Sequence, residues 1–505
     1  MNEIILNRVI AMERSSGILM PMSSLPSEYG IGTMGKCAYA FADFLKAAGQ
    51  SYWQLLPLSP TSCGNSPYSS FSTFAGNPYY IDLDMLIDEG LLIEEEVRVV
   101  NWGKNVQKTD YSRITEGRRK VLRLAYGRGR KKCAKAVEIF HEENREWLDN
   151  YALFMAVKEH FGGISWTEWP DEDIRMHRPE AVEDYKKKLK EEMDFHFFIQ
   201  FLFFRQWEKL RNYVHKRGIG FIGDIPIYVT LDSADVWSEP QFFLLDEKNV
   251  PIEVAGVPPD YFAEDGQLWG NPLYDWDAMK ADGYGWWIRR IEGARKLYDV
   301  IRIDHFRGFD SYWAVPFGEK TAKNGYWRPG PGIAFVSMLT SWFYGLQFIA
   351  EDLGCQSEGV QKLLEDSGLP GMRVLQFAFD AKNESTYLPH NLERNSVCFV
   401  GTHDNNTVKG WLKETKKCDR EYAKSYMHIT EDEGWCWGFI RTGMESVSRL
   451  FVVQMQDVLE LDGKCRMNVP GVAEGNWHWR MEPDAITPEL AEKLKKYTIT
   501  YHRCR

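Results

Sequence analysis

The sequence lacks the features that would place the chain in a membrane, in an oxidising compartment or on nucleic acid. Its nine cysteines are scattered and form no C-x-x-C pair, which argues against a disulfide framework and favours a reducing compartment. No apolar run is long enough to span a bilayer, and charged residues interrupt the N-terminal stretch where a signal peptide needs an apolar segment. The net charge of −11 argues against a general nucleic-acid binder. We therefore expect a cytoplasmic protein with no membrane and no nucleic-acid partner.

Nucleotide and metal motifs are also missing. Residues 30–35, GIGTMG, match G-x-G-x-x-G, but residues 23–29 separate them from the preceding expected strand. The next expected strand ends without an acidic residue, so the dinucleotide interpretation fails. The chain has no H-E-x-x-H, no Cys/His cluster and no EF-hand loop. We expect neither a metal nor an organic cofactor.

Short apolar segments alternate with helical patterns along the 505 residues. Such alternation predicts an α/β fold with a parallel sheet, and eight units predict a closed (β/α)8 TIM barrel. The expected strands are Gly17–Met22, Tyr52–Leu58, Ile219–Val229, Tyr298–His305, Leu346–Leu353, Met372–Phe379, Val397–His403 and Lys464–Gly471.

Two connections are too long for a single barrel crossover. Residues 90–215, between the second and third strands, are charged and helical in pattern, which predicts a mainly helical insertion. Residues 230–290, between the third and fourth strands, are rich in Trp, Tyr, Pro and Gly, which predicts a substrate-loop insertion. We expect residues 1–505 to form one catalytic barrel that carries these insertions.

Three carboxylates, Asp304, Glu351 and Asp404, come where an expected strand ends. A helix N-cap or an ion pair would explain any one of them alone. In a barrel, however, the C-terminal strand ends share one rim, where catalytic side chains collect. Arg302 lies two residues before Asp304 and faces the same side of the strand, where it would keep an attacking carboxylate ionised. The pattern is typical of retaining enzymes that cleave or transfer glycosyl groups with one nucleophilic carboxylate and one acid–base carboxylate.

Long blocks of the sequence match a known family. They include SLPSEYGIG, GNSPYSSFSTFAGNPY, GDIPIYV, VAGVPPDYFAEDGQLWGNPLYDW, RIDHFRGF, AEDLG, GTHDNNT and RMNVPG. These blocks run along nearly the whole chain. Because of them, the sequence resembles the 4-α-glucanotransferases (amylomaltases, or disproportionating enzymes), which are relatives of the α-amylases. The resemblance implies a (β/α)8 barrel with helical subdomain insertions and no C-terminal β-sandwich domain. It also implies transfer of α-1,4-glucan segments between maltooligosaccharides through a covalent glycosyl-enzyme.

The same resemblance assigns roles to individual residues. It makes Asp304 the nucleophile, Glu351 the general acid and base, and Asp404 the carboxylate that holds sugar hydroxyls. The substrate-binding residues that it implies are Ser66, Tyr68, Asp224, Asp260, Tyr261, Gln267, Trp269, Arg302 and His403. From the residues alone, Tyr261 and Trp269 could also be core aromatics that anchor their loop, and His403 could be a structural histidine.

The chain departs from the family pattern at two positions. Cys63 stands where an aromatic residue is usual, which puts a secondary glucan contact in doubt, and Asn406 stands where an aspartate is frequent. Two alternative functions stay open at this point. One is a hydrolase of the α-amylase kind, with the same carboxylates and a cleft that admits water. The other is a non-catalytic glucan-binding protein, which predicts a missing carboxylate, and none is missing.

Overall fold

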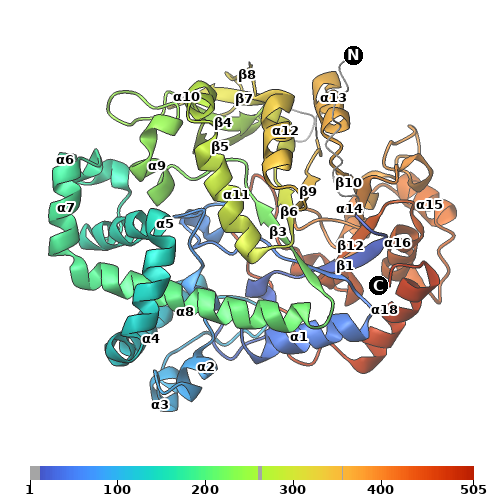
Figure 1. Ribbon diagram of the computed structural model, residues 1–505. Helices are drawn as coiled ribbons and strands as arrows, with labels where there is room; N and C mark the ends of the chain where they lie inside the picture. Colours follow the sequence, from blue (N-terminus) through green and yellow to red (C-terminus); the bar gives the residue numbers. More distant parts are fainter. Residues whose placement is uncertain (1–11, 260–263, 355–356, 505) are drawn as a thin grey trace.

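The computed structural model describes residues 12–259, 264–354 and 357–504 (Figure 1). Parallel strands close a barrel in the order β1-β12-β11-β10-β9-β6-β3-β2, so the predicted (β/α)8 barrel is confirmed. The barrel strands are β1 (Ser15–Leu19), β2 (Tyr52–Gln54), β3 (Gly220–Ile225), β6 (Val300–Ile303), β9 (Gln347–Ala350), β10 (Gly371–Val374), β11 (Ser396–Phe399) and β12 (Leu450–Gln454).

The sequence predicts the eighth strand at Lys464–Gly471, and this prediction is wrong. That segment consists of a short 3-10 helix, η9 (Gly463–Cys465), and irregular backbone. The eighth strand is β12, whose residues LFVVQ are buried throughout. A parallel barrel strand is covered on both faces, so a continuous apolar run fits it better than the alternating pattern of the later segment.

Helices surround the barrel and fill most of the chain between β2 and β3 (Figure 1). The last of them, α8, packs against both α5 and the barrel helix α1 through an aromatic face. The helices are α1 (Lys36–Ala47), α2 (Leu83–Asp88), α3 (Glu94–Arg98), α4 (Tyr111–Lys132), α5 (Ala134–His160), α6 (Glu172–Arg175), α7 (Pro179–Lys188), α8 (Lys190–His215), α9 (Ala234–Ser238), α10 (Trp276–Ala281), α11 (Gly285–Leu297), α12 (Gly332–Trp342), α13 (Glu358–Ser367), α14 (Val408–Glu414), α15 (Lys417–Tyr426), α16 (Gly434–Glu445), α17 (Met455–Val458) and α18 (Pro488–Thr500).

The connections on either side of β6 build a second sheet, which the sequence analysis did not predict. Its strands are β4 (Glu253–Val257), β5 (Gln267–Pro272), β7 (Ser311–Pro316) and β8 (Tyr326–Pro329), antiparallel in the order β5-β4-β7-β8. Figure 1 shows it at the top of the molecule, above the barrel strands β3 and β6. The predicted substrate residues Gln267 and Trp269 therefore lie on a strand rather than on a loop.

An arginine that follows α18 fixes the seam between β1 and β12. Arg503 is fully buried, and its Nη1 donates to the carbonyl oxygen of Ser15 at 2.9 Å. Its Nη2 donates to the carbonyl oxygen of Ser448 at 3.0 Å, just before β12. The two strands that close the barrel thus share one guanidinium. Beyond β12, the residues that the structure describes form no further strand, and no described helix has the length and apolar content of a membrane span.

Gly223, in β3, leaves room for a tyrosine behind the strand. A Cβ atom at Gly223 would lie 2.0 Å from the ring of Tyr298. Tyr298 is buried and cannot swing away freely, because its hydroxyl accepts the N–H of Leu58 at 3.2 Å. Overpacking of a core typically costs about 1–3 kcal/mol. We expect Gly223→Ala to lower the free energy of unfolding by this amount, measured by denaturant unfolding.

Gly127 offers a matched control for this substitution. It lies in the middle of α4, is exposed, and has no atom near the position of an added Cβ. Alanine favours a helix interior over glycine by about 1 kcal/mol. Gly127→Ala should therefore stabilise the protein slightly, and equal effects of the two changes would contradict the packing argument.

Candidate active site

Strand register brings charged residues together at the C-terminal rim of the barrel. Asp224 of β3 pairs with Arg302 of β6. One position further on, Ile303 of β6 pairs with Ala350 of β9, and Asp304 and Glu351 follow these two residues directly. Adjacent strands lie about 4.8 Å apart. Asp304 and Glu351 therefore leave neighbouring strands at the same level.

Arg302 joins two carboxylates inside the barrel. Its Nη1 donates to both carboxylate oxygens of Asp224 at 2.7 Å and to Oδ1 of Asp304 at 2.9 Å. The Asp224 side chain is 0% exposed and that of Arg302 is 4% exposed, whereas Asp304 keeps 27% of its side chain accessible. The guanidinium is thus buried with its charge compensated on one side, and it presents a partly accessible carboxylate on the other.

Glu351 is held by the backbone of the turns that follow β6 and β9. Its Oε2 accepts the N–H of His305 at 2.7 Å, and its Oε1 accepts the N–H of Leu353 at 3.0 Å. His305 has φ +50°, in the left-handed region that non-glycine residues rarely adopt. This strained turn aims an N–H group at Glu351, and backbone strain of this kind gathers at functional sites.

Asp404 lies after the end of β11, beside its neighbour His403. Asp404 Oδ2 is 3.4 Å from His403 Nε2. Asn468 donates from Nδ2 to Asp404 Oδ1 at 2.6 Å, and Arg466 donates to the Asp404 carbonyl oxygen at 2.6 Å. The Asp404 side chain is 42% exposed. Asn468 therefore fixes one carboxylate oxygen while part of the side chain stays accessible to solvent.

Tyr68 connects the carboxylate cluster to an aromatic stack. Its hydroxyl donates to Asp224 Oδ2 at 2.7 Å. Its ring stacks on the His403 ring, with centroids 5.1 Å apart and planes 20° apart, and Trp477 packs against both rings. Ser66 accepts the Tyr68 N–H on its hydroxyl at 3.2 Å, so it shapes the turn that carries Tyr68.

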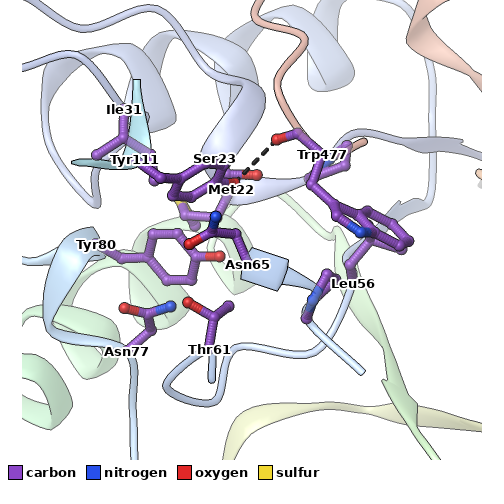
Figure 2. Close-up of a pocket in the computed structure, with 12 residues that line it drawn as sticks. Met22, Ser23, Ile31, Leu56, Thr61, Asn65, Asn77, Tyr80, Tyr111 and Trp477 are labelled. Atoms are coloured by element: carbon purple, nitrogen blue, oxygen red, sulfur yellow. Dashed lines mark hydrogen bonds between the residues drawn. The ribbon is translucent and has the colours of Figure 1, made fainter. Parts of the chain in front are cut away.

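Figure 2 shows that Tyr111, at the start of α4, is hydrogen-bonded to Trp477. Tyr111 donates its hydroxyl proton to the carbonyl oxygen of Trp477 at 2.9 Å, beside a cavity of about 10 Å³. The Trp477 N–H donates to the Met467 carbonyl oxygen at 2.7 Å, and its φ is +67°. These two bonds hold Trp477 in an unfavourable backbone conformation, so the predicted insertion contacts the site through Tyr111.

Trp269 and Gln267 reach the rim from the second sheet. The Trp269 ring contacts the His305 ring edge-to-face, with centroids 4.7 Å apart, and its Nε1 donates to Gln267 Oε1 at 3.2 Å. Gln267 is thus tied to Trp269 rather than to a carboxylate. Two further predicted residues, Asp260 and Tyr261, lie outside the described residues.

Two carboxyl groups of this cluster, those of Asp304 and Glu351, hold their protons more tightly than usual. Burial raises the pKa of Asp304, the charges of Asp224 and Glu351 raise it further, and Arg302 opposes them. Burial also raises the pKa of Glu351. Burial lowers the pKa of His403 despite the nearby Asp404 charge, so that imidazole is neutral at pH 7. Two adjacent carboxyls of this kind share a proton near neutrality.

Sequence reasoning missed Asn468 and Trp477. Asn468 stands in the RMNVPG block, but the segment was expected to be a strand, which hid its contact with Asp404. Trp477 gave no local signal, because only the folded chain brings it beneath Tyr68. The departure at Asn406 has a structural role, since its side chain donates to Glu414 at 2.6 Å. Among the residues that the structure describes, no cluster of His, Cys, Asp or Glu is arranged to hold a metal ion.

The buried charge of Asp224 depends on Arg302. Removing one partner of a buried ion pair typically costs about 3–5 kcal/mol, because the other charge is left uncompensated. We expect Arg302→Met to lower the free energy of unfolding by this amount at pH 7, measured by denaturant unfolding.

The double variant is the control. In Arg302→Met/Asp224→Asn no fully buried charge is left unpaired, because the Asp304 side chain keeps 27% of its surface accessible. At least half of the lost stability should therefore return. A double variant as unstable as Arg302→Met alone would show that packing, not charge, causes the loss.

Comparisons with known proteins show which family the chain belongs to. The family model described as 4-alpha-glucanotransferase matches residues 20–487. The 4-alpha-glucanotransferase of Clostridium butyricum is 47% identical over 487 residues, which cover 96% of this chain and 100% of that protein. The 4-alpha-glucanotransferase of Streptococcus pneumoniae is 46% identical over 493 residues, which cover 97% of this chain and 98% of that protein.

The chain is also similar to solved structures of amylomaltases. The amylomaltase of Streptococcus agalactiae, solved in complex with acarbose, superposes with a TM-score of 0.95 at 40% identity, covering 98% of this chain and 100% of that one. The amylomaltase of Corynebacterium glutamicum, at 19% identity and TM-score 0.75, covers 97% of this chain and 75% of that one, and shares the fold. The chain therefore belongs to the 4-alpha-glucanotransferase family.

Proposed function

We propose that this 4-alpha-glucanotransferase moves α-1,4-glucan segments between maltooligosaccharides by a retaining double displacement, with Asp304 as nucleophile and Glu351 as general acid and base. The observation that carries the proposal is the register of β6 and β9, which sets the two carboxyls on neighbouring strands at one level. Retaining glycosidases place their two carboxyls about 5–5.5 Å apart, close to the spacing of adjacent strands.

Arg302 supports the division of roles between the two carboxyls. It donates a charged hydrogen bond to Asp304, whereas Glu351 receives only backbone N–H groups. Charge-assisted hydrogen bonds stabilise an anion more strongly than neutral ones do. The proton that the pair shares therefore belongs on Glu351, which leaves Asp304 ionised for attack.

The reaction then proceeds in two steps. Asp304 attacks the anomeric carbon while Glu351 protonates the departing 4-oxygen of the next sugar. The 4-hydroxyl of a second glucan, or of glucose, is then deprotonated by Glu351 and attacks the glycosyl ester with overall retention.

The surrounding residues would bind the sugars. Asp404, turned outward by Asn468, would hold ring hydroxyls at the cleaved bond, and neutral His403 would donate or accept beside it. Tyr68 and Trp269 would offer ring faces to the sugars, and Asp260 and Tyr261 remain proposed contacts. We also propose a cytoplasmic location, on the argument that scattered cysteines suit a reducing compartment.

Incubation with maltotriose tests the activity and the nucleophile together. The purified protein should produce glucose and a ladder of longer maltooligosaccharides, resolved by chromatography. Asp304→Asn should abolish turnover and still bind maltotriose, because the amide keeps the shape of the carboxylate but cannot attack. Shorter products alone would mean that water is the main acceptor and would support a hydrolase. Persisting activity in Asp304→Asn would exclude Asp304 as the nucleophile.

The proton donor has its own signature. Because its pKa is raised, Glu351 stays protonated to a higher pH than an ordinary glutamate, and activity should fall as pH rises through that raised pKa. Glu351→Gln should lower kcat with maltotriose by about 10²–10⁴-fold. It should also lose the alkaline limb of the pH–rate profile.

A substrate whose leaving group needs no proton provides the control. Glu351→Gln should still release fluoride from α-maltosyl fluoride in a burst that reports the first step. An alkaline limb that survives in Glu351→Gln would assign the proton donor to another residue.

A further inference from the structure

A second pocket, of about 180 Å³, lies on the flank of the barrel between α5, α9 and α11. Figure 1 shows the three helices in the left half of the molecule. Its lining combines aromatic rings, amides and carboxyls, among them Phe74, Trp147, Asn150, Asp235 and Glu239. None of these residues takes part in the site described above.

Ion pairs and hydrogen bonds fix the walls of this flank pocket. Arg289 of α11 donates from Nη2 to Glu239, next to α9, at 2.6 Å, and its Nε lies 3.3 Å from Glu146 of α5. Asp235 of α9 is 5% exposed and accepts the Thr73 N–H at 2.9 Å. The three helices are thus tied around the cavity rather than left apart.

An aromatic surface forms one side of the flank pocket. Trp147 of α5 is half-buried, and its ring lies near-parallel to that of Phe74, with centroids 6.4 Å apart and planes 15° apart. Its Nε1 donates to Asn144 Oδ1 at 3.3 Å, which orients the indole. Flat aromatic faces next to amides and carboxylates suit a ligand with apolar C–H faces and hydroxyl edges.

The charges of the lining select against anions. The acidic lining residues are Glu143, Glu146, Asp235, Glu239 and Glu292, and the basic ones are Arg289 and Lys296. Arg289 pairs with Glu146 and Glu239, and Arg295 pairs with Glu292. Two guanidiniums thus pair with three of the five acidic residues, and the lining keeps more acidic than basic groups. This balance disfavours anions, and the carboxyl oxygens offer hydrogen-bond acceptors to a neutral, hydroxyl-rich ligand.

We propose that the flank pocket is a second glucan-binding site, which takes a single glucosyl unit of an α-1,4-glucan outside the catalytic cleft. Pockets that hold drug-sized ligands have volumes of about 300–1,000 Å³. The flank pocket is smaller, and its volume suits a single sugar ring. The choice of ligand rests on the proposed function, because a glucan is the substrate of the cleft.

The loop that carries Tyr68 runs directly from the cleft to the flank pocket. Tyr68 contacts Asp224 in the cleft, whereas Ser72 and Phe74 line the flank pocket. Between them, the Thr73 hydroxyl accepts from Arg290 Nε at 3.0 Å, and the Thr73 N–H binds Asp235. A glucan chain held in the flank pocket would thus be anchored near the cleft, which raises its local concentration there.

Two variants test the flank pocket and one serves as a control. Asn150→Trp fills the cavity from the surface of α5, and Trp147→Ala removes the aromatic surface. Trp342→Ala removes a tryptophan that is 64% exposed at the end of α12, away from the flank pocket. Each is made in the Asp304→Asn background and titrated with maltotriose by calorimetry, after circular dichroism has established that it folds.

The parent should show two classes of binding site, and so should Trp342→Ala. Asn150→Trp and Trp147→Ala should each keep binding in the catalytic cleft and lose binding in the flank pocket. With Asp304 restored, Asn150→Trp should keep its kcat with maltotriose, while its KM for long amylose rises about 3-fold or more.

Other outcomes would overturn the proposal. A parent with one site that Asn150→Trp leaves unchanged would mean that the flank pocket binds no glucan. If spermidine binds to the parent in place of maltotriose, and this binding is lost in Asn150→Trp, the flank pocket is a site for a cation. Loss of the cleft site in the parent, with no turnover by the unmodified protein, would instead count against the proposed function.

Discussion

A single guanidinium placed between two carboxylates is the interaction on which the site depends. Arg302 compensates Asp224 inside the barrel and also contacts Asp304 at its rim. A charge as deeply buried as that of Asp224 is tolerated only with such a partner. The requirement that keeps the barrel interior stable therefore also sets the position and charge of Asp304, the proposed nucleophile. Tyr68 joins the same network through Asp224, so the ring that we propose faces the sugars shares this constraint.

The barrel was predictable because its signal is repeated and local. Each strand is a short apolar run, and the carboxylates stand out because they come where such runs end. The prediction of the eighth strand was wrong because it relied on the alternation at residues 464–471 and passed over the run LFVVQ. A continuous apolar run is the better indicator of a strand that is covered on both faces.

The second sheet and the supports of the site could not be predicted in this way. β4 pairs with β7 across the whole of β6, so the contact that joins the two halves of this sheet links segments remote in the sequence. Trp477 packs against Tyr68 and His403, and Tyr111, from a distant helix, helps to hold its backbone. Contacts between residues far apart in the sequence leave no periodic pattern. Arg302 and Asp304 lie two residues apart, and the period of a strand predicts that they face the same side.

The seam of the barrel has a consequence for the time course of folding. β1 and β12 pair residues such as Ser15 and Leu450, and Arg503 bonds to Ser15 across 488 positions of the chain. Closing so large a loop carries an entropic penalty and slows folding. During synthesis, β1 must wait with one edge unpaired until almost the entire described chain has left the ribosome. Exposed strand edges invite pairing with other chains, so the interval before the seam closes is the period in which this protein is most exposed to aggregation.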